Sequence, residues 1–224
     1  MAQQGSERSR TVVVILSLSL LYAAGVLIFQ NTCDDAYISF RYARNLVDGH
    51  GLVWNPGEWV EGYTNFLWVL ILALGMKLGV DPATTAAIGG VLAGAAVLWL
   101  LAQQCKERFG AGHLLAWLPV GLLVCNRSFL AWSTGGLATM FFTLLVFAGL
   151  LSYLRERDEL VAWPIASSLL LALATLTRPD GGIFTFVVGI FFLQEVLRGR
   201  LRTPSDSACL PARLRAGSWV FGLV

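Results

Sequence analysis

The chain of 224 residues is 56% hydrophobic and only 13% charged, with a mean hydropathy of +0.68. Soluble domains carry about 25% charged residues, so the composition excludes an ordinary soluble domain and predicts an all-α integral membrane protein built as a multi-span helical bundle. A net charge of +2 without a clustered basic stripe excludes a nucleic-acid-binding protein.

Metal and disulfide chemistry have few candidate residues. The four cysteines show no paired or metal-like spacing, and only Cys33 falls in an obvious loop outside the membrane, so no disulfide framework is expected. The two histidines, His50 and His113, argue against a histidine-rich metal site. The residues imply no definite cofactor, and a divalent metal stays an open alternative.

The first apolar segment covers residues 11–30 and follows the polar start MAQQGSERSR. Its 20 residues exceed the roughly 7–15 residues of a signal-peptide core, and no small-x-small cleavage site follows. We therefore expect a retained span. At the other end, PARLRAGSWVFGLV enters a new apolar segment and stops, so we expect residues 1–224 to be the N-terminal part of a longer transmembrane domain.

Further apolar segments approach the roughly 17–25 residues that a span needs. Four of them are residues 84–103, 138–154, 160–176 and 182–196. Two others are ambiguous: residues 65–80 contain Lys77, and residues 111–130 are interrupted by Pro119. Their placement depends on the charges of the loops.

Loop charge favours one topology, because cytoplasmic loops collect Lys and Arg. If 111–130 crosses and 65–80 does not, 11 of the 16 basic residues lie inside; the five outside are Arg41, Arg44, Lys77, Arg127 and Arg178. If every candidate crosses, 4 lie inside, 11 lie outside and Lys77 falls within a span. The first arrangement predicts about six spans, a cytoplasmic N-terminus, a cytoplasmic loop at 203–212 and a juxtamembrane helix at 65–80. A variant in which 111–130 alone does not cross stays open.

The longest polar-rich stretch lies in residues 31–83, which would form the first outer loop. Asp34 and Asp35 are placed to open a helix over residues 36–47, since free N–H groups and the helix dipole favour acids there. One face of this helix carries Ala36, Phe40, Ala43 and Val47, and another carries Asp34, Tyr37, Arg41, Arg44 and Asp48.

The second face combines acids with arginines. An enzyme that moves a sugar from a lipid phosphate needs both: a carboxylate takes the proton of the acceptor hydroxyl, and cations stabilise the departing phosphate. The alternative is that Asp34 is a simple helix cap and that the arginines reach to lipid headgroups.

The rest of this loop is rich in turns and aromatic residues. Gly49-His50-Gly51 predicts a helix end, and Asn55-Pro56-Gly57 predicts a turn. His50 is a candidate ligand or proton carrier, against the alternative of a hydrogen-bonded loop histidine; Glu58 and Glu61 are further candidates for substrate contact. The aromatic residues suit an interfacial belt, with sugar stacking as the alternative; they are Trp54, Trp59, Tyr63, Phe66 and Trp68.

Two shorter outer segments complete the expected site, residues 126–138 and the TRPDG of residues 177–181. Proline and glycine in TRPDG end one helix and start the next, and Asp180 could cap the second helix. Arg178 at headgroup depth is a candidate phosphate ligand, against the alternative of anchoring to ordinary lipids.

Residues 34–68 together with TRPDG resemble bacterial GT-C type membrane glycosyltransferases, above all the arabinofuranosyltransferases of mycobacterial cell-wall assembly. The likeness covers most of the chain and only the N-terminal part of such an enzyme. It implies a polyprenyl-phosphate sugar donor and inverting transfer to a cell-envelope glycan or lipid, on the outer side of the bacterial plasma membrane. It also implies juxtamembrane helices in the first outer loop.

The resemblance places an essential aspartate on Asp34 or Asp35, the expected general base. The expected phosphate ligands are Arg41, Arg44 and Arg178. Further substrate contacts are expected at Tyr37, His50, Glu58, Glu61, Tyr63 and Asp180.

Two departures from the family pattern stand out. Relatives usually read Ser-Gly-Leu-Glu-Thr where this chain has Ala138 in place of the acid, and they often carry a basic residue where Trp59 stands. Two other classes of function stay open: a transporter or lipid flippase, which would need charges near the middle of its spans, and a catalytically silent membrane scaffold.

Overall fold

The structure is a computed structural model that describes residues 2–58, 60–110, 113–159 and 164–198. Within these ranges the chain is helical, with no strand beyond an isolated bridge between Asn55 and Glu58. The elements are α1 (Ala2–Ile28), α2 (Ala36–Val47), α3 (Phe66–Lys77), α4 (Pro82–Phe109), the 3-10 helix η1 (Leu114–Ala116), α5 (Leu118–Val124), α6 (Arg127–Thr134), α7 (Thr139–Asp158), α8 (Ile165–Thr177) and α9 (Gly181–Leu197). Trp59, Cys209, residues 203–212 and the arginines after Arg198 lie outside the described residues.

Among the described residues, three helices are long and apolar enough to cross a membrane: Ser9–Ile28 of α1, α4 and α7. They match the spans predicted at 11–30, 84–103 and 138–154. The shorter apolar helices α8 and α9 fall where spans were predicted at 160–176 and 182–196, with 13 and 17 residues. The chain is thus a helical membrane protein, and the count of six spans stays a prediction.

The segment predicted as a span at 111–130 is broken in the structure. It is divided into η1, the seven-residue α5 and α6. Pro119 lies in the first turn of α5, where its missing N–H costs nothing. Asn126 then caps α6 by accepting from Phe129 N at 3.0 Å. After the break, α6 packs against the N-terminal part of α4, where Ser133 lies against Gly90.

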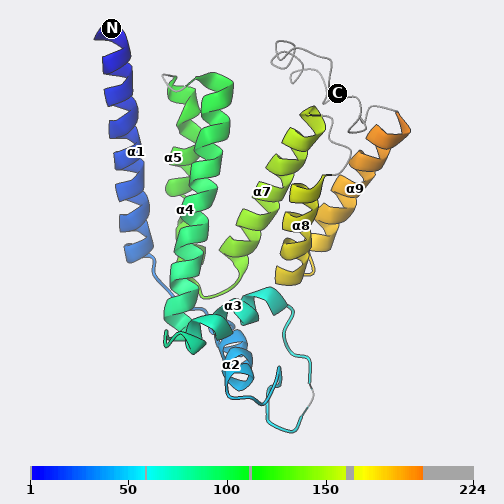
Figure 1. Cartoon of the computed structure of the whole chain (residues 1–224). Helices are drawn as coiled ribbons and strands as arrows, with labels where there is room; N and C mark the ends of the chain where they lie inside the picture. The colour runs from blue at the N-terminus through cyan, green and yellow to red at the C-terminus, as the bar shows by residue number, and fades with distance from the viewer. Residues whose placement is uncertain (1, 59, 111–112, 160–163, 199–224) are drawn as a thin grey trace.

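Large apolar side chains point outward on the helices of the bundle. Leu20 is 70% exposed, Ile183 65% and Phe186 69%. A soluble monomer rarely exposes contiguous apolar surface of this kind, whereas a bilayer solvates it. Across the bundle, α1 packs on α5 and α6, and α4 packs on α7. In turn, α7 packs on α8 and α9 (Figure 1).

Four of the basic residues predicted on the inner side lie at one end of the bundle. The last turn of α4 carries Lys106 and Arg108, and the last turn of α7 carries Arg155 and Arg157. The two turns lie close together, because Arg155 Nη2 is 3.9 Å from Glu107 Oε1. The other end carries α2 and α3 (Figure 1). These four residues, all predicted on the inner side, therefore lie at the end of the bundle opposite to α2 and α3, and the orientation in the membrane stays a prediction.

The helices predicted in the first outer loop are both present. In α2, Ala36, Phe40 and Ala43 are buried, as the predicted apolar face requires, while Tyr37 and Arg44 are exposed. The helix ends at Val47 with Asp48 as its C-cap residue, and the following Gly49 has the positive φ of 85° predicted for a left-handed helix end. The Asn55-Pro56-Gly57 turn is confirmed by the hydrogen bond from Glu58 N to Asn55 O at 3.1 Å.

Trp68 does not belong to an interfacial belt or a sugar platform, and that expectation is wrong for this residue. Its side chain is 1% exposed, and its ring lies 5.8 Å from Phe141 of α7. Its Nε1 donates to Gly136 O at 3.1 Å. Trp68 therefore joins α3 to the loop before α7, because a buried indole N–H needs an acceptor.

The contact between α4 and α6 leaves no room for a side chain at Gly90. A Cβ at this position would meet the carbonyl oxygen of Ser133, a backbone atom that cannot turn aside. We expect Gly90→Ala to destabilise the protein by about 1–3 kcal/mol, the usual cost of overpacking. The matched control is Gly189→Ala in α9, where a Cβ meets nothing within 4 Å and alanine should stabilise the helix by about 0.5–1 kcal/mol. Thermal unfolding in detergent measures both, and equal effects would contradict this packing.

Candidate functional site

A cleft of about 390 Å³ opens at the end of the bundle that carries α2 and α3. Four separate parts of the chain line it: the start of α2, residues 62–65, the start of α7 and the turn between α8 and α9. The lining residues are Asp35, Ile38, Ser39, Gly62, Tyr63, Thr64, Asn65, Leu137, Ala138 and Arg178. Of the sequence-predicted site residues, the cleft brings together Asp35, Tyr63 and Arg178.

The two aspartates before α2 differ in their position. Both are exposed, but only Asp35, the N-cap residue of α2, lines the cleft. Asp35 makes no side-chain capping bond, so the predicted cap is present in position but not in hydrogen bonding. The start of α2 is held instead by the backbone, through Cys33 N and Gly135 O at 2.9 Å. The carboxylate of Asp35 therefore makes no hydrogen bond that caps α2.

Tyr42 of α2 fixes the wall formed by residues 62–65. Its side chain is 1% exposed, and its hydroxyl accepts from Gly62 N at 2.9 Å and donates to Val60 O at 2.9 Å. Its ring lies 4.8 Å from the ring of Tyr63. Burial, with a smaller contribution from Glu61, raises the pKa of Tyr63, so this phenol is a neutral hydrogen-bond donor at physiological pH.

Asn65 and Ser39 add a polar pair to the same wall. Asn65 Nδ2 donates to Ser39 Oγ at 2.8 Å, and both residues line the cleft. Neither residue was predicted as a site residue from the sequence, nor were Thr64 and the supporting Tyr42. A signal existed for Ser39, because it is a polar residue among the apolar positions of α2, and a buried hydroxyl needs a partner.

Arg178 lies in the turn between α8 and α9. Because Pro179 disfavours a helical conformation at the residue before it, α8 ends and Arg178 is extended, with φ −153° and ψ 137°. Its Nε and Nη2 donate to Asp180 Oδ2 at 3.2 and 2.9 Å, and its guanidinium lies 5.7 Å from the Phe142 ring centre. Asp180 is the N-cap residue of α9 without a capping bond, so its carboxylate binds Arg178 instead.

The ion pair of Arg178 is weak enough to exchange. The two side chains are 41% and 57% exposed, and exposed pairs contribute about 0–1 kcal/mol. A phosphate offers the guanidinium a stronger, charge-assisted partner. Arg178 can therefore bind an anion in the cleft at little cost to the fold.

Ala138 lines the cleft at the start of α7. It is 3% exposed and is the N-cap residue of α7. The preceding loop is held by Trp68, and its Gly136 needs a positive φ of 81°. Ala138 thus lies at a helix N-terminus in the cleft that Asp35 also lines, where the helix dipole would favour a negative charge.

The two arginines predicted on α2 lie outside the cleft. Arg41 donates to Trp54 O at 2.9 Å and to Asn55 Oδ1 at 2.6 Å, and its guanidinium is 4.3 Å from the centre of the Trp54 ring. It therefore braces the loop. Arg44 is exposed on the outer face of α2. The helical spacing placed these residues on one face of α2, but neither of them lines the cleft.

The remaining predicted contacts also lie outside. Tyr37 is exposed and packs edge-on against Phe40, with ring centres 5.3 Å apart. His50 is exposed in the turn after α2, and Glu58 accepts from Asn55 Nδ2 at 2.9 Å. Glu61 is exposed next to the cleft residue Gly62. Among the residues that the structure describes, no three His, Cys, Asp or Glu side chains come close enough to hold a metal ion.

Comparison with known proteins gives one distant relationship. No protein-family profile and no solved structure matches the chain. The chain is similar to the terminal beta-(1->2)-arabinofuranosyltransferase of Mycobacterium tuberculosis (strain ATCC 25618 / H37Rv), with 28% identity over 208 residues. The match covers 83% of this chain, and the chain spans 31% of the length of that relative. With the apolar helices, this similarity supports a membrane protein related to a glycosyltransferase.

Proposed function

We propose that the chain is the N-terminal, cleft-bearing part of a GT-C type membrane glycosyltransferase. The donor is a polyprenyl-phosphate sugar, arabinofuranose or a related sugar, and the acceptor is a glycan or lipid of the cell envelope. The sugar carbon inverts in the transfer. The distant similarity to an arabinofuranosyltransferase supports the class of reaction.

The observation that carries the proposal is the meeting of Asp35 and Arg178 in one cleft, from segments far apart in the sequence. Asp35 takes the proton of the acceptor hydroxyl as it attacks the sugar carbon. Arg178 stabilises the phosphate as it leaves with the lipid. The Tyr63 hydroxyl and the Asn65 amide offer hydrogen bonds to the sugar.

The position of the cleft suits a lipid-linked donor. It opens where the membrane-crossing helices end, so that the phosphate can lie at headgroup depth while the polyprenyl chain stays in the bilayer. The opposite end of the bundle carries Lys106, Arg108, Arg155 and Arg157. Since cytoplasmic surfaces collect such residues, we place that end and the N-terminus in the cytoplasm, and the cleft on the outer side of a bacterial plasma membrane. In this arrangement α1, α4, residues 113–134, α7, α8 and α9 make the six passes.

The direct test is transfer from a panel of radiolabelled polyprenyl-phosphate sugars, using membranes from cells that express the gene, with and without divalent metal. We expect product from polyprenyl-phosphate arabinofuranose or one close analogue. Membranes that lack the gene provide the control. If protein shown to be folded transferred sugar from none of the donors, the proposal would be wrong.

Ala138 favours a second candidate, a silent scaffold descended from such an enzyme. An alanine stands at the position of the family's acid, in the cleft that Asp35 also lines. Ala138→Glu, assayed in the same panel, separates the two candidates. If the wild type is silent and Ala138→Glu transfers sugar, the scaffold is correct. If the wild type already transfers sugar, the enzyme is correct.

A further inference from the structure

A second hollow, which shares no lining residue with the cleft, lies between α1, α4 and α5. It has a volume of about 260 Å³, and it is lined mainly by apolar side chains of three helices. Along α1 the lining residues are Ile15, Leu18, Ser19 and Tyr22; along α4 they are Ala95, Leu98, Trp99, Ala102 and Lys106; Trp117, Val120 and Val124 complete it. In both helices these positions recur at the spacing of one helical face, so the hollow is a groove parallel to the helix axes. We call it the α1–α4 groove.

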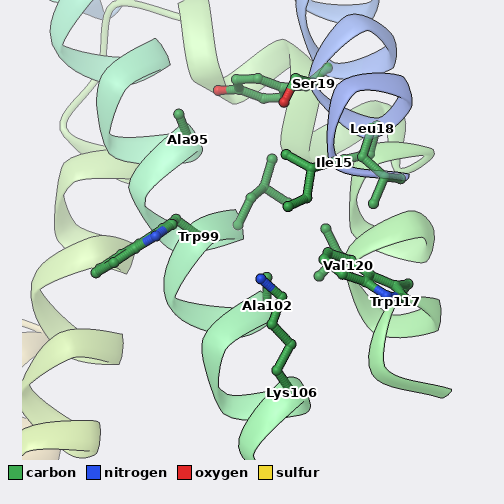
Figure 2. Close-up of a pocket in the computed structure, with 12 residues that line it drawn as sticks. Ile15, Leu18, Ser19, Ala95, Trp99, Ala102, Lys106, Trp117 and Val120 are labelled. Carbon is green, nitrogen blue, oxygen red and sulfur yellow. The ribbon is translucent and has the colours of Figure 1, made fainter. Parts of the chain in front are cut away.

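Small residues and helix divergence create this groove. α1 packs on α5 and α6, so the facing sides of α1 and α4 stand apart along this length. Ser19, Ala95 and Ala102 contribute little volume to the gap (Figure 2). The outer rim is apolar and exposed, with Trp99 61% exposed. In a membrane, lipid chains reach this rim directly.

Lys106 places a cation in the groove, at its end near the C-terminus of α4. Figure 2 shows the side chain of Lys106 running back along α4, so that its amino group lies beside Ala102, the direction that long side chains take on a helix. The ammonium lies 4.8 Å from the centre of the Trp117 ring. Among the residues that the structure describes, no carboxylate lies within ion-pair distance of Lys106. The groove thus combines an apolar length with one ammonium at the end of the bundle where headgroups lie.

We propose that the α1–α4 groove binds an anionic phospholipid, with one acyl chain along the groove and its phosphate paired with Lys106. An apolar wall accepts an acyl chain of any lipid, so the selectivity for an anionic headgroup comes from the Lys106 ammonium. Basic pockets between membrane helices bind anionic headgroups by this combination. The site is independent of the cleft, and its occupancy does not depend on the sugar-transfer proposal.

Native mass spectrometry of the purified chain tests this proposal. The protein is released from nanodiscs that contain equal amounts of phosphatidylglycerol and phosphatidylcholine. The wild type should retain one phosphatidylglycerol with about fivefold preference, since one basic residue near the surface contributes about 1 kcal/mol. Lys106→Gln should remove the preference. Lys77→Gln is the matched control, because the chain has two lysines and Lys77 lies exposed on α3, away from the groove.

A second variant tests the acyl chain. Ala95 is exposed at the groove, so Ala95→Phe should fill the space without disturbing the core, and retention of both lipids should fall. Quenching of tryptophan fluorescence by phosphatidylglycerol with brominated acyl chains should weaken in the same variant. Three results would each overturn the proposal: equal retention of the two lipids by the wild type, an unchanged preference in Lys106→Gln, or displacement of the phospholipid by equimolar polyprenyl phosphate.

Discussion

Replacing Asp35 by asparagine is expected to lower sugar transfer by roughly 10²–10⁴-fold, the usual contribution of a general base. The amide has nearly the shape of the carboxylate but cannot take the proton of the acceptor hydroxyl. The fold should persist, because Asp35 makes no capping bond and asparagine is an equally good N-cap residue. Initial rates with a saturating donor measure the loss, and thermal unfolding measures the stability.

The neighbouring residue provides the control for this variant. Asp34→Asn removes the same charge one position away, from an exposed residue that does not line the cleft. We expect its rate to stay within a few-fold of the wild type. The sequence left the two aspartates as alternatives, so this pair of variants tests the geometry of the cleft. A larger loss in Asp34→Asn than in Asp35→Asn would assign the base to Asp34 and place the reaction outside the cleft.

Replacing Arg178 by glutamine should lower kcat/KM for the donor by roughly 10²–10³-fold, the cost of removing one group that stabilises charge in the transition state. Arg178→Lys should be intermediate, since lysine keeps the charge and loses the two-pronged geometry. The loss of the pair with Asp180 should cost the fold no more than about 1 kcal/mol. Transfer rates over a range of donor concentrations, and thermal unfolding, measure the two effects.

Arg44 offers the matched control for Arg178. Both residues were predicted to bind the donor phosphate, but only Arg178 lines the cleft. Arg44→Gln should therefore change kcat/KM by less than a few-fold. An equal loss in the two variants would mean that α2 presents its outer face to the phosphate, contrary to the present arrangement.

The helices could be predicted because local rules determine them. Residues 36–47 show one apolar face, and the structure places α2 at the same bounds. Asp81 and Pro82 start α4 by a side-chain cap to Ala83 N at 3.0 Å, and Pro179 ends α8. Each of these signals lies within a few residues of the feature that it sets.

The cleft could be predicted only in part, because its walls come together through long-range contacts. Periodicity grouped Arg41 and Arg44 with the acids, yet it could not show that Arg41 binds the 54–55 turn. Trp68 was predicted to be an interfacial aromatic residue, but it is buried against α7 and its indole N–H donates to Gly136 O. The side chain of Asn65 is held by a hydrogen bond to Ser39, 26 residues earlier in the chain. No local pattern encodes such contacts.

The most direct measurement is capture of the donor in the cleft. Benzoylphenylalanine replaces Thr64, an exposed residue of the cleft wall, and the protein is irradiated with a radiolabelled polyprenyl-phosphate sugar. The same group in place of Tyr37, which is 59% exposed and does not line the cleft, is the control. A donor site in the cleft predicts labelling at position 64 that unlabelled donor suppresses, and little at position 37. Equal labelling at both positions, or labelling at 37 alone, would contradict the assignment of the cleft to sugar transfer.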